Sequence, residues 1–145
     1  MTGDTVFIAS DHAGFAMKQA LCADLAARGF RMEDLGPQTA ESCDYPVFAH
    51  ALCARVLENA GRGILICGTG IGMCMAANRH RGIRAALCTD EYTARACRAH
   101  NNADVLCLGA RVVAPALAAE LAVIFLSTAF EGGRHARRVA LIESS

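Results

Sequence analysis

Residues 63–72 read GILICGTGIG, an apolar run that ends in Cys67 and passes into a loop with glycine at every second position. A short apolar run bounded by glycines predicts a buried strand that presents Cys67 at its carboxyl end. Glycines let a backbone approach a ligand closely, and consecutive N–H groups in such a loop form a pocket for an anion. A cysteine there lies in a positive field that favours the thiolate. The stretch therefore indicates chemistry on an oxyanion.

Strand and helix patterns alternate on both sides of this stretch. Short runs that are apolar on both faces, separated by segments of helical periodicity, are typical of a parallel sheet covered by helices. We therefore expect an α/β fold with a three-layer, Rossmann-like open sheet of about five parallel strands, in a single domain over residues 1–145. The expected strands are 6–9, 30–35, 64–67, 84–88 and 105–108, and the expected helices are 15–27, 47–57, 71–78, 89–100, 115–128 and 135–142.

Composition and charge argue against several classes of protein. Of the 145 residues, 54% are hydrophobic and 19% are charged, which excludes a disordered chain, and the formal net charge of zero argues against a nucleic-acid partner. A polar start and the absence of a long apolar run predict neither a signal peptide nor a membrane span. The eight cysteines contain no Cys-x-x-Cys pair, so we expect a reduced cytoplasmic protein whose cysteines are mostly core residues and bind no metal.

Candidate site residues follow the predicted strands, because ligands of open parallel sheets bind at the carboxyl ends of the strands. Asp11 and His12 follow the first strand, and Arg111 follows the fifth. His100 and Asn101 follow the helix that comes after the fourth strand. We expect all of these residues to gather with Cys67 and Thr69 at one edge of the sheet.

Each candidate also has a purely structural interpretation. The place of Cys67 before the glycine loop favours a functional role for this cysteine over the others, including Cys74. Thr69 fits a helix cap as well as a catalytic hydroxyl, and His100 fits the carboxyl end of a helix equally well. The basic residues of segment 79–84 are expected to lie on the solvated surface.

The basic segment 132–138 predicts a solvated tail when it is taken alone. Beside an anion-binding loop, an arginine clamp on phosphate becomes a reasonable interpretation. Arg134 and Arg138 are four residues apart and would share one face of a helix, from which Arg137 would point away.

Two other chemistries of glycine loops do not fit. A dinucleotide-binding fold needs Gly-x-Gly-x-x-Gly after its first strand, whereas this loop follows the third strand and has Met73 at the last position. A cysteine phosphatase needs an arginine at that same position. A non-catalytic module that binds phosphate or a nucleotide stays open, although it would leave Cys67 and His100 without a role.

Taken in order, the motifs of this chain resemble those of one family. They are SDHAGF at 10–15, DYP at 44–46, GILICGTGIG at 63–72, AAN at 76–78, GIRA at 82–85, HN at 100–101, GARVV at 109–113 and EGGRH at 131–135. Together they span nearly the whole chain, which resembles ribose-5-phosphate isomerase type B, in the group that includes galactose-6-phosphate isomerase subunits. The resemblance implies an aldose–ketose isomerase of the pentose phosphate pathway that uses no metal or cofactor. It also implies homodimers with shared sites, or a tetramer built from them, and a C-terminal helix that packs on the partner.

The resemblance also implies roles for individual residues. Cys67 would be the base that moves a proton between C1 and C2 through an enediolate, Thr69 would support it, and His100 would be the acid that opens the furanose ring. Asp11, which would also take part in catalysis, and His12 would bind the sugar hydroxyls or the ring oxygen. The N–H groups of Gly68, Thr69, Gly70, Ile71 and Gly72 would bind the oxyanion, and Asn101 would contact the enediolate. Arg111, Arg134 and Arg138 would bind the substrate and its phosphate.

One subgroup of this family lacks the cysteine and has a glutamate base just after the last glycine of the loop. That position is Met73 here, so the chain resembles the cysteine-base subgroup. Ribose 5-phosphate and ribulose 5-phosphate are the favoured substrate pair. Allose 6-phosphate, galactose 6-phosphate and erythrulose 4-phosphate are the alternatives for the same chemistry.

Overall fold

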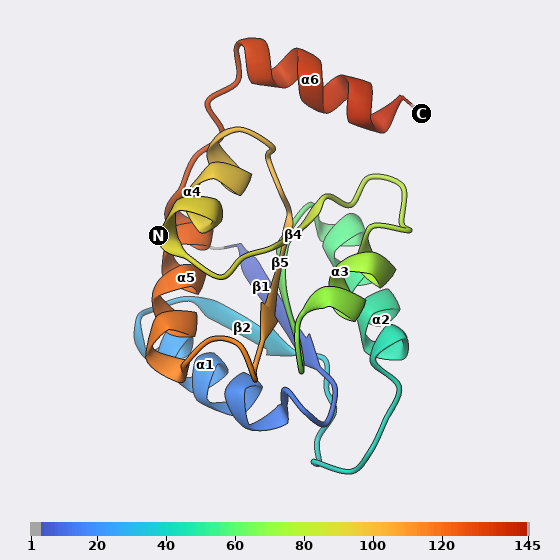
Figure 1. The fold of residues 1–145 in the computed structure, drawn as a ribbon, viewed down its shortest axis with the longest axis vertical. Helices are drawn as coiled ribbons and strands as arrows, with labels where there is room; N and C mark the ends of the chain where they lie inside the picture. The colour runs from blue at the N-terminus through green and yellow to red at the C-terminus, as the bar shows by residue number, and fades with distance from the viewer. Residues whose placement is uncertain (1–3, 145) are drawn as a thin grey trace.

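The computed structural model describes residues 4–144, in which one parallel sheet lies between two layers of helices (Figure 1). This arrangement confirms the predicted three-layer α/β fold. The strands are β1 (Thr5–Ser10), β2 (Arg31–Asp34), β3 (Arg62–Cys67), β4 (Ala85–Leu87) and β5 (Val105–Gly109), in the order β2-β1-β3-β5-β4. The helices are α1 (Phe15–Ala27), α2 (Tyr45–Asn59), α3 (Ile71–Ala77), α4 (Glu91–Ala99), α5 (Pro115–Ser127) and α6 (Arg134–Glu143).

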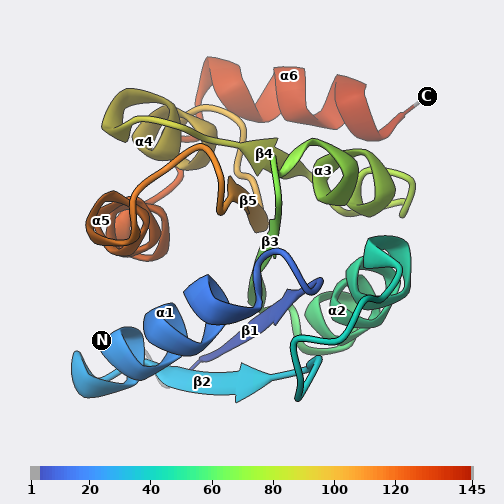
Figure 2. The same cartoon turned by 60° about the horizontal axis from the view of Figure 1, so that its bottom comes forward.

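The two faces of the sheet bury alternate residues of the same strand. Ile64 and Ile66 of β3 pack in one core with α1, α4 and α5, whereas Leu65 and Cys67 pack in the other with α2 and α3. Figure 2 shows the two groups of helices on opposite sides of the sheet. Because side chains alternate along a strand, the Cys67 side chain points to the α2 and α3 side.

The strand register aligns the ends of the three central strands. Ser10 pairs with Ile66, and Cys67 pairs with Gly109. We call the loops that follow these strands, residues 11–14, 68–70 and 110–114, the carboxyl edge. The amino edge is the opposite end, where the strands begin, and it includes loop 100–104. Helix α6 lies at the amino edge, at the top of Figure 1, away from the loops of the carboxyl edge.

Most predicted elements are confirmed to within a few residues, and the differences have local causes. Helix α2 begins at Tyr45, two residues before the prediction, because Pro46 is compatible with a first helical turn. Helix α4 begins at Glu91 because the side chain of Asp90 accepts a hydrogen bond from the Thr93 N–H at 2.7 Å and caps the helix.

Most of the cysteines are core residues, as the sequence predicts. All eight are free thiols, and five are buried: Cys53, Cys67, Cys88, Cys97 and Cys107. Within residues 4–144, no helix has the length and apolar character needed to cross a membrane.

Candidate active site

The sulfur of Cys67 lies under the glycine loop that follows β3. The residue is only 5% exposed, and the N–H of Gly70 donates a hydrogen bond to its Sγ at 3.2 Å. The side chain of Thr69 accepts a hydrogen bond from the N–H of Ile71 at 3.2 Å, so Thr69 stabilises the start of α3. The loop thus fixes the sulfur with a backbone donor and leaves the exposed Thr69 beside it.

Two glycines of this loop are required by its geometry. Gly70 has a φ of +80°, which side chains rarely adopt, and a Cβ there would lie 2.9 Å from the carbonyl carbon of Leu108. A Cβ on Gly72 would lie 2.5 Å from the ring of Tyr45. The alternating glycines therefore allow the loop to fit between β5 and the start of α2.

Asp11 and His12 lie beside this loop. The Asp11 N–H donates to the carbonyl of Ile66 at 3.1 Å, which ties the residue to the strand that carries Cys67. Its carboxylate accepts a hydrogen bond from the Gly14 N–H at 3.0 Å. His12 is exposed, and its Nδ1 accepts from the N–H of Cys43 at 3.2 Å. With Nδ1 as the acceptor, Nε2 carries the proton of the neutral ring and can donate to a ligand.

Arg111 brings a positive charge to the same loop. Its N–H donates to the carbonyl of Gly68 at 3.0 Å, and a Cβ on Gly68 would lie 3.1 Å from the guanidinium Nη1. The guanidinium therefore covers Gly68, while Arg111 itself remains exposed. The carboxyl edge thus brings together five side chains that the sequence predicted for the site: Asp11, His12, Cys67, Thr69 and Arg111.

His100 and Asn101 do not join this group, and the prediction that all candidates gather at one edge is wrong. Helix α4 runs back along the sheet, so it returns the chain to the amino edge. There the Gly63 N–H, at the start of β3, donates to the carbonyl of Asp104 at 2.9 Å. Strand β5 then runs from Val105 to Gly109, which pairs with Cys67, and this length of strand is about 13 Å. His100 and Asn101 therefore lie at the opposite end of the sheet from Cys67.

His100 is part of a histidine–carboxylate cluster at the amino edge. Its ring stacks on His135, with centroids 4.4 Å apart and planes 13° apart. An oxygen of Glu131 lies 3.9 Å from Nε2 of His100 and 3.6 Å from Nε2 of His135. Desolvation, followed by the charges of His100 and Arg134, lowers the pKa of His135 and favours its neutral ring.

The ligand atoms of this cluster all lie within 4.8 Å of one another, and no other described group of three histidine, cysteine or acidic residues is close enough to hold a metal ion. The cationic side chains of Arg134 and Arg138 also act on His135, and they oppose the binding of a cation there.

The predicted phosphate-binding arginines lie on α6 at the amino edge. Arg134 begins the helix, Arg138 follows one turn later, and both are exposed. Arg137 is exposed as well. Arg134 and Arg138 therefore accompany His100 and Asn101, and the predicted site residues divide into two groups at opposite edges.

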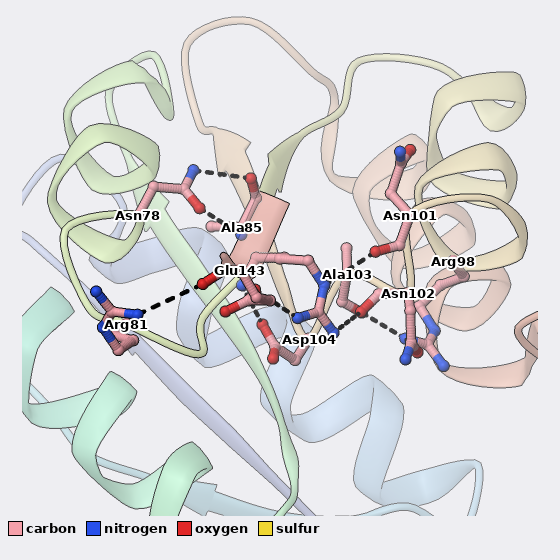
Figure 3. Close-up of polar contacts among 10 residues, drawn as sticks. Asn78, Arg81, Ala85, Arg98, Asn101, Asn102, Ala103, Asp104 and Glu143 are labelled. Carbon is pink, nitrogen blue, oxygen red and sulfur yellow. Dashed lines mark hydrogen bonds and ion pairs between the residues drawn. The ribbon is translucent and has the colours of Figure 1, made fainter. Parts of the chain in front are cut away.

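Arg84 was predicted to be a solvated surface residue, and this prediction is wrong. Its side chain is only 18% exposed and donates three hydrogen bonds, to Glu143 and to the carbonyls of Asn101 and Asn102 (Figure 3). The only signal in the sequence is its place directly before a short apolar strand, where a side chain can reach the loops of the amino edge.

A second cysteine has an altered pKa but a different position. The pKa of Cys74 is lowered to about 7, chiefly by a hydrogen bond from the Cys107 thiol. Hydrogen bonds from the Leu87 backbone and from Asn78 also lower this pKa, whereas desolvation raises it. The Sγ atom of Cys74 lies 3.5 Å from the carbonyl of Ala85, so it faces β4 and not the glycine loop. An acidic thiol alone therefore does not make Cys74 a candidate base.

The family model described as Ribose/Galactose Isomerase matches residues 6–142. The chain belongs to this family. Ribose-5-phosphate isomerase B of Escherichia coli strain K12 is 42% identical, over 91% of this chain and 89% of that protein.

Solved structures of the ribose/galactose isomerase family have the same fold. The ribose 5-phosphate isomerase of Thermotoga maritima has a TM-score of 0.96 at 46% identity, over 99% of this chain and 100% of the other. Ribose-5-phosphate isomerase B of Mycoplasma genitalium, with bound ribulose-5-phosphate, has a TM-score of 0.93 at 44% identity, over 96% and 93% of the two chains.

At the position where the resemblance implies a glutamate base in one subgroup, α3 carries Met73, whose side chain is fully buried in the core that α2 and α3 share with the sheet. The loop therefore presents no carboxylate at that point.

Proposed function

We propose that this chain interconverts D-ribose 5-phosphate and D-ribulose 5-phosphate through ring opening and an enediolate. The observation that carries the proposal is the Cys67 sulfur held under the glycine loop by the N–H of Gly70 at 3.2 Å. The family and the relative solved with ribulose-5-phosphate support this choice of substrate. We place the enzyme in the cytoplasm and in the pentose phosphate pathway, as the resemblance implies.

Cys67 is the proposed base. Its thiolate takes a proton from C2 of the open aldose, and the carbonyl oxygen on C1 becomes an enediolate oxygen. The O2 hydroxyl proton moves to O1 and the thiol returns its proton to C1, which leaves a carbonyl at C2 and gives the ketose. The N–H groups of residues 68–72 that are not already bound to Cys67 or Thr69, together with the Thr69 hydroxyl, supply donors to the developing negative charge. One such donor lowers the barrier by about 3–4 kcal/mol in other enzymes.

The remaining side chains of the carboxyl edge bind the sugar in this proposal. His12 donates from Nε2 to a sugar oxygen, and Asp11 accepts from a hydroxyl. Arg111 contributes its charge above the loop. The proposed chemistry needs no metal ion or cofactor, because the base and the oxyanion donors all belong to the chain.

The proposed site is completed by a second copy of the chain. His100, Asn101, Arg134 and Arg138 lie at the amino edge and cannot reach Cys67 of their own chain, whereas a twofold dimer can bring the two edges together. Exposed apolar residues on the elements around the loop support such an interface. They are Ile71, Met75, Leu87, Tyr92 and Val112, which are 36–74% exposed.

In the dimer, His100 of one copy acts as the acid that opens the furanose ring at the Cys67 site of the other. Asn101 contacts the enediolate, and Arg134 and Arg138 bind the phosphate from one face of α6. Leu141 and Ile142 of this helix are 60% and 53% exposed, which supports packing of α6 on the partner. Two such dimers could pair into a tetramer, and a measurement of the molecular mass in solution distinguishes the dimer from the tetramer.

Complementation between two inactive variants tests the shared site. Cys67→Ala and His100→Asn, co-expressed, form mixed dimers in which one of the two sites has both residues intact. If half of the dimers are mixed, about a quarter of the wild-type activity returns. Activity no greater than that of either variant alone would contradict the shared site.

Substrate choice has its own test. We expect kcat/KM to be highest for ribose 5-phosphate among ribose 5-phosphate, allose 6-phosphate, galactose 6-phosphate and erythrulose 4-phosphate. A higher value for another sugar would keep the chemistry and change the substrate. Tight nucleotide binding with no turnover of any of them would favour a non-catalytic binding module.

A further inference from the structure

Arg84 lies directly before β4 and joins two segments that are distant in the sequence. Its Nε donates to the carbonyl of Asn101 at 3.0 Å, and its Nη2 donates to the carbonyl of Asn102 at 2.9 Å. Its Nη1 donates to Oε1 of Glu143, near the end of α6, at 2.7 Å. Figure 3 shows Glu143 on one side of this cluster and Asn101 and Asn102 on the other. One planar guanidinium therefore fixes a loop and a helix with its fork of donors.

The backbone of Arg84 is itself anchored to the sheet. Its N–H donates to Oδ1 of Asp104 at 2.7 Å, and its carbonyl accepts from the Asp104 N–H at 2.9 Å. Asp104 also joins the start of β3 through the Gly63 N–H. The guanidinium therefore extends from a rigid point of the amino edge.

Helix α6 contacts the rest of its chain near both of its ends. His135, which stacks on His100 near the beginning of the helix, is the only one of its described residues that is buried. Near the other end, Arg84 binds the side chain of Glu143, which is 31% exposed, and Nη1 of Arg81 donates to the backbone carbonyl of Glu143 at 3.4 Å. The helix is thus held at two points about 12 Å apart, and Arg138 lies between them.

The two segments held by Arg84 carry the amino-edge half of the proposed site. Loop 100–104 carries His100 and Asn101, and α6 carries Arg134 and Arg138. A substrate must meet the acid and the phosphate-binding arginines at once, so the relative position of the two segments matters. Misplacement of about 1 Å costs roughly a hundredfold in rate in other enzymes.

We propose that Arg84 is a positioning residue for the isomerase reaction. Its ion pair with Glu143 fixes the phosphate-binding arginines on α6, and its bonds to the carbonyls of Asn101 and Asn102 fix the loop of the acid. This inference rests on the proposed function. It adds to that function a residue that touches no substrate and that acts on binding and on catalysis through different donors.

Three variants separate the two arms of Arg84. Glu143→Gln weakens only the arm to α6, so KM for ribose 5-phosphate rises about tenfold while kcat stays within about twofold. Arg84→Met removes both arms, so KM rises and kcat also falls by about tenfold or more. Arg84→Lys retains a charge for Glu143 but cannot also bond both carbonyls, so it restores KM more fully than kcat.

The control is Arg28→Met, which removes an arginine from the exposed ion pair with Asp24 at the end of α1. We expect both KM and kcat of this variant to match the wild type. Assays are run well below the melting temperature of each variant, so a purely structural role of Arg84 would lower the melting temperature and leave KM and kcat unchanged.

An active wild type whose KM and kcat are unaffected by Glu143→Gln and Arg84→Met would overturn this inference alone. Equal effects of all three variants on KM and kcat would also overturn it, because the two arms would then have no separate roles. A wild type that isomerises no sugar phosphate would instead overturn the proposed function.

Discussion

The two edges of the sheet hold their functional groups in different ways. At the carboxyl edge, the backbone positions Cys67: its strand is paired on both sides, and an N–H of its own loop bonds to the sulfur. At the amino edge, side-chain contacts position the functional groups: the rings of His100 and His135 stack, and the guanidinium of Arg84 donates hydrogen bonds to the neighbouring loop and helix. The proposed base therefore lies on a strand that is hydrogen-bonded to both neighbours, whereas the proposed acid and phosphate-binding arginines lie on segments that side-chain contacts hold in place.

The largest effect is expected at the base. Cys67→Ala should lower kcat for ribose 5-phosphate by about a thousandfold, because no other group replaces a base at that point. Binding of ribulose 5-phosphate, measured by calorimetry, should change little. Cys74→Ser is the matched control, and its kcat should stay near normal although the pKa of Cys74 is about 7. Near-normal turnover by Cys67→Ala would remove the cysteine from its proposed role.

A smaller effect that depends on the substrate is expected at the acid. His100→Asn should lower kcat for ribose 5-phosphate by about a hundredfold, because the furanose ring must be opened. The same variant should convert erythrulose 4-phosphate almost as well as the wild type, since a four-carbon sugar phosphorylated at O4 cannot close a furanose ring. An equal loss on both substrates would show that His100 does not act in ring opening.

Backbone packing at the carboxyl edge gives the third test. A Cβ on Gly109 would lie 2.5 Å from the carbonyl oxygen of Thr69, so Gly109→Ala must displace the glycine loop that follows β3. We expect a loss of about 1–3 kcal/mol in the free energy of unfolding and a lower kcat. Gly29→Ala is the control, because Gly29 has a φ of +98° but open space around it. It should lose about 1 kcal/mol and leave kcat unchanged. A normal kcat in Gly109→Ala would mean that the loop is less rigid than its packing indicates.

The smallest effect concerns proton binding at the amino edge. The pKa of His135 is lowered from 6.5 by desolvation and by the nearby charges of His100 and Arg134. Because the unfolded chain then binds the proton more readily, His135 makes stability fall as pH drops below about 6.5. NMR titration should place the midpoint of His135 below that value, and His100→Asn should raise it. A midpoint at or above the ordinary value would contradict the desolvated, stacked arrangement.

Much of the carboxyl edge could be predicted from the sequence because its signals are local. The apolar run before Cys67 indicates a strand, and the alternating glycines indicate the loop that follows. Parallel strands end at the same edge, so Asp11 and Arg111 could be placed beside Cys67 without coordinates. The same reasoning failed for His100, because a helix that follows a strand returns the chain to the opposite edge.

The sequence by itself determined the alternation of strands and helices, the cysteine at the end of β3 and the candidate site residues, since each depends on neighbours in the chain. Only the tertiary structure decided how these residues are grouped. It placed His100, Arg134 and Arg138 a sheet length away from Cys67, and it turned Arg84 inward to join loop 100–104 to α6. Such contacts join residues 17 to 59 positions apart in the chain, and no local pattern encodes which distant acceptor an arginine will reach.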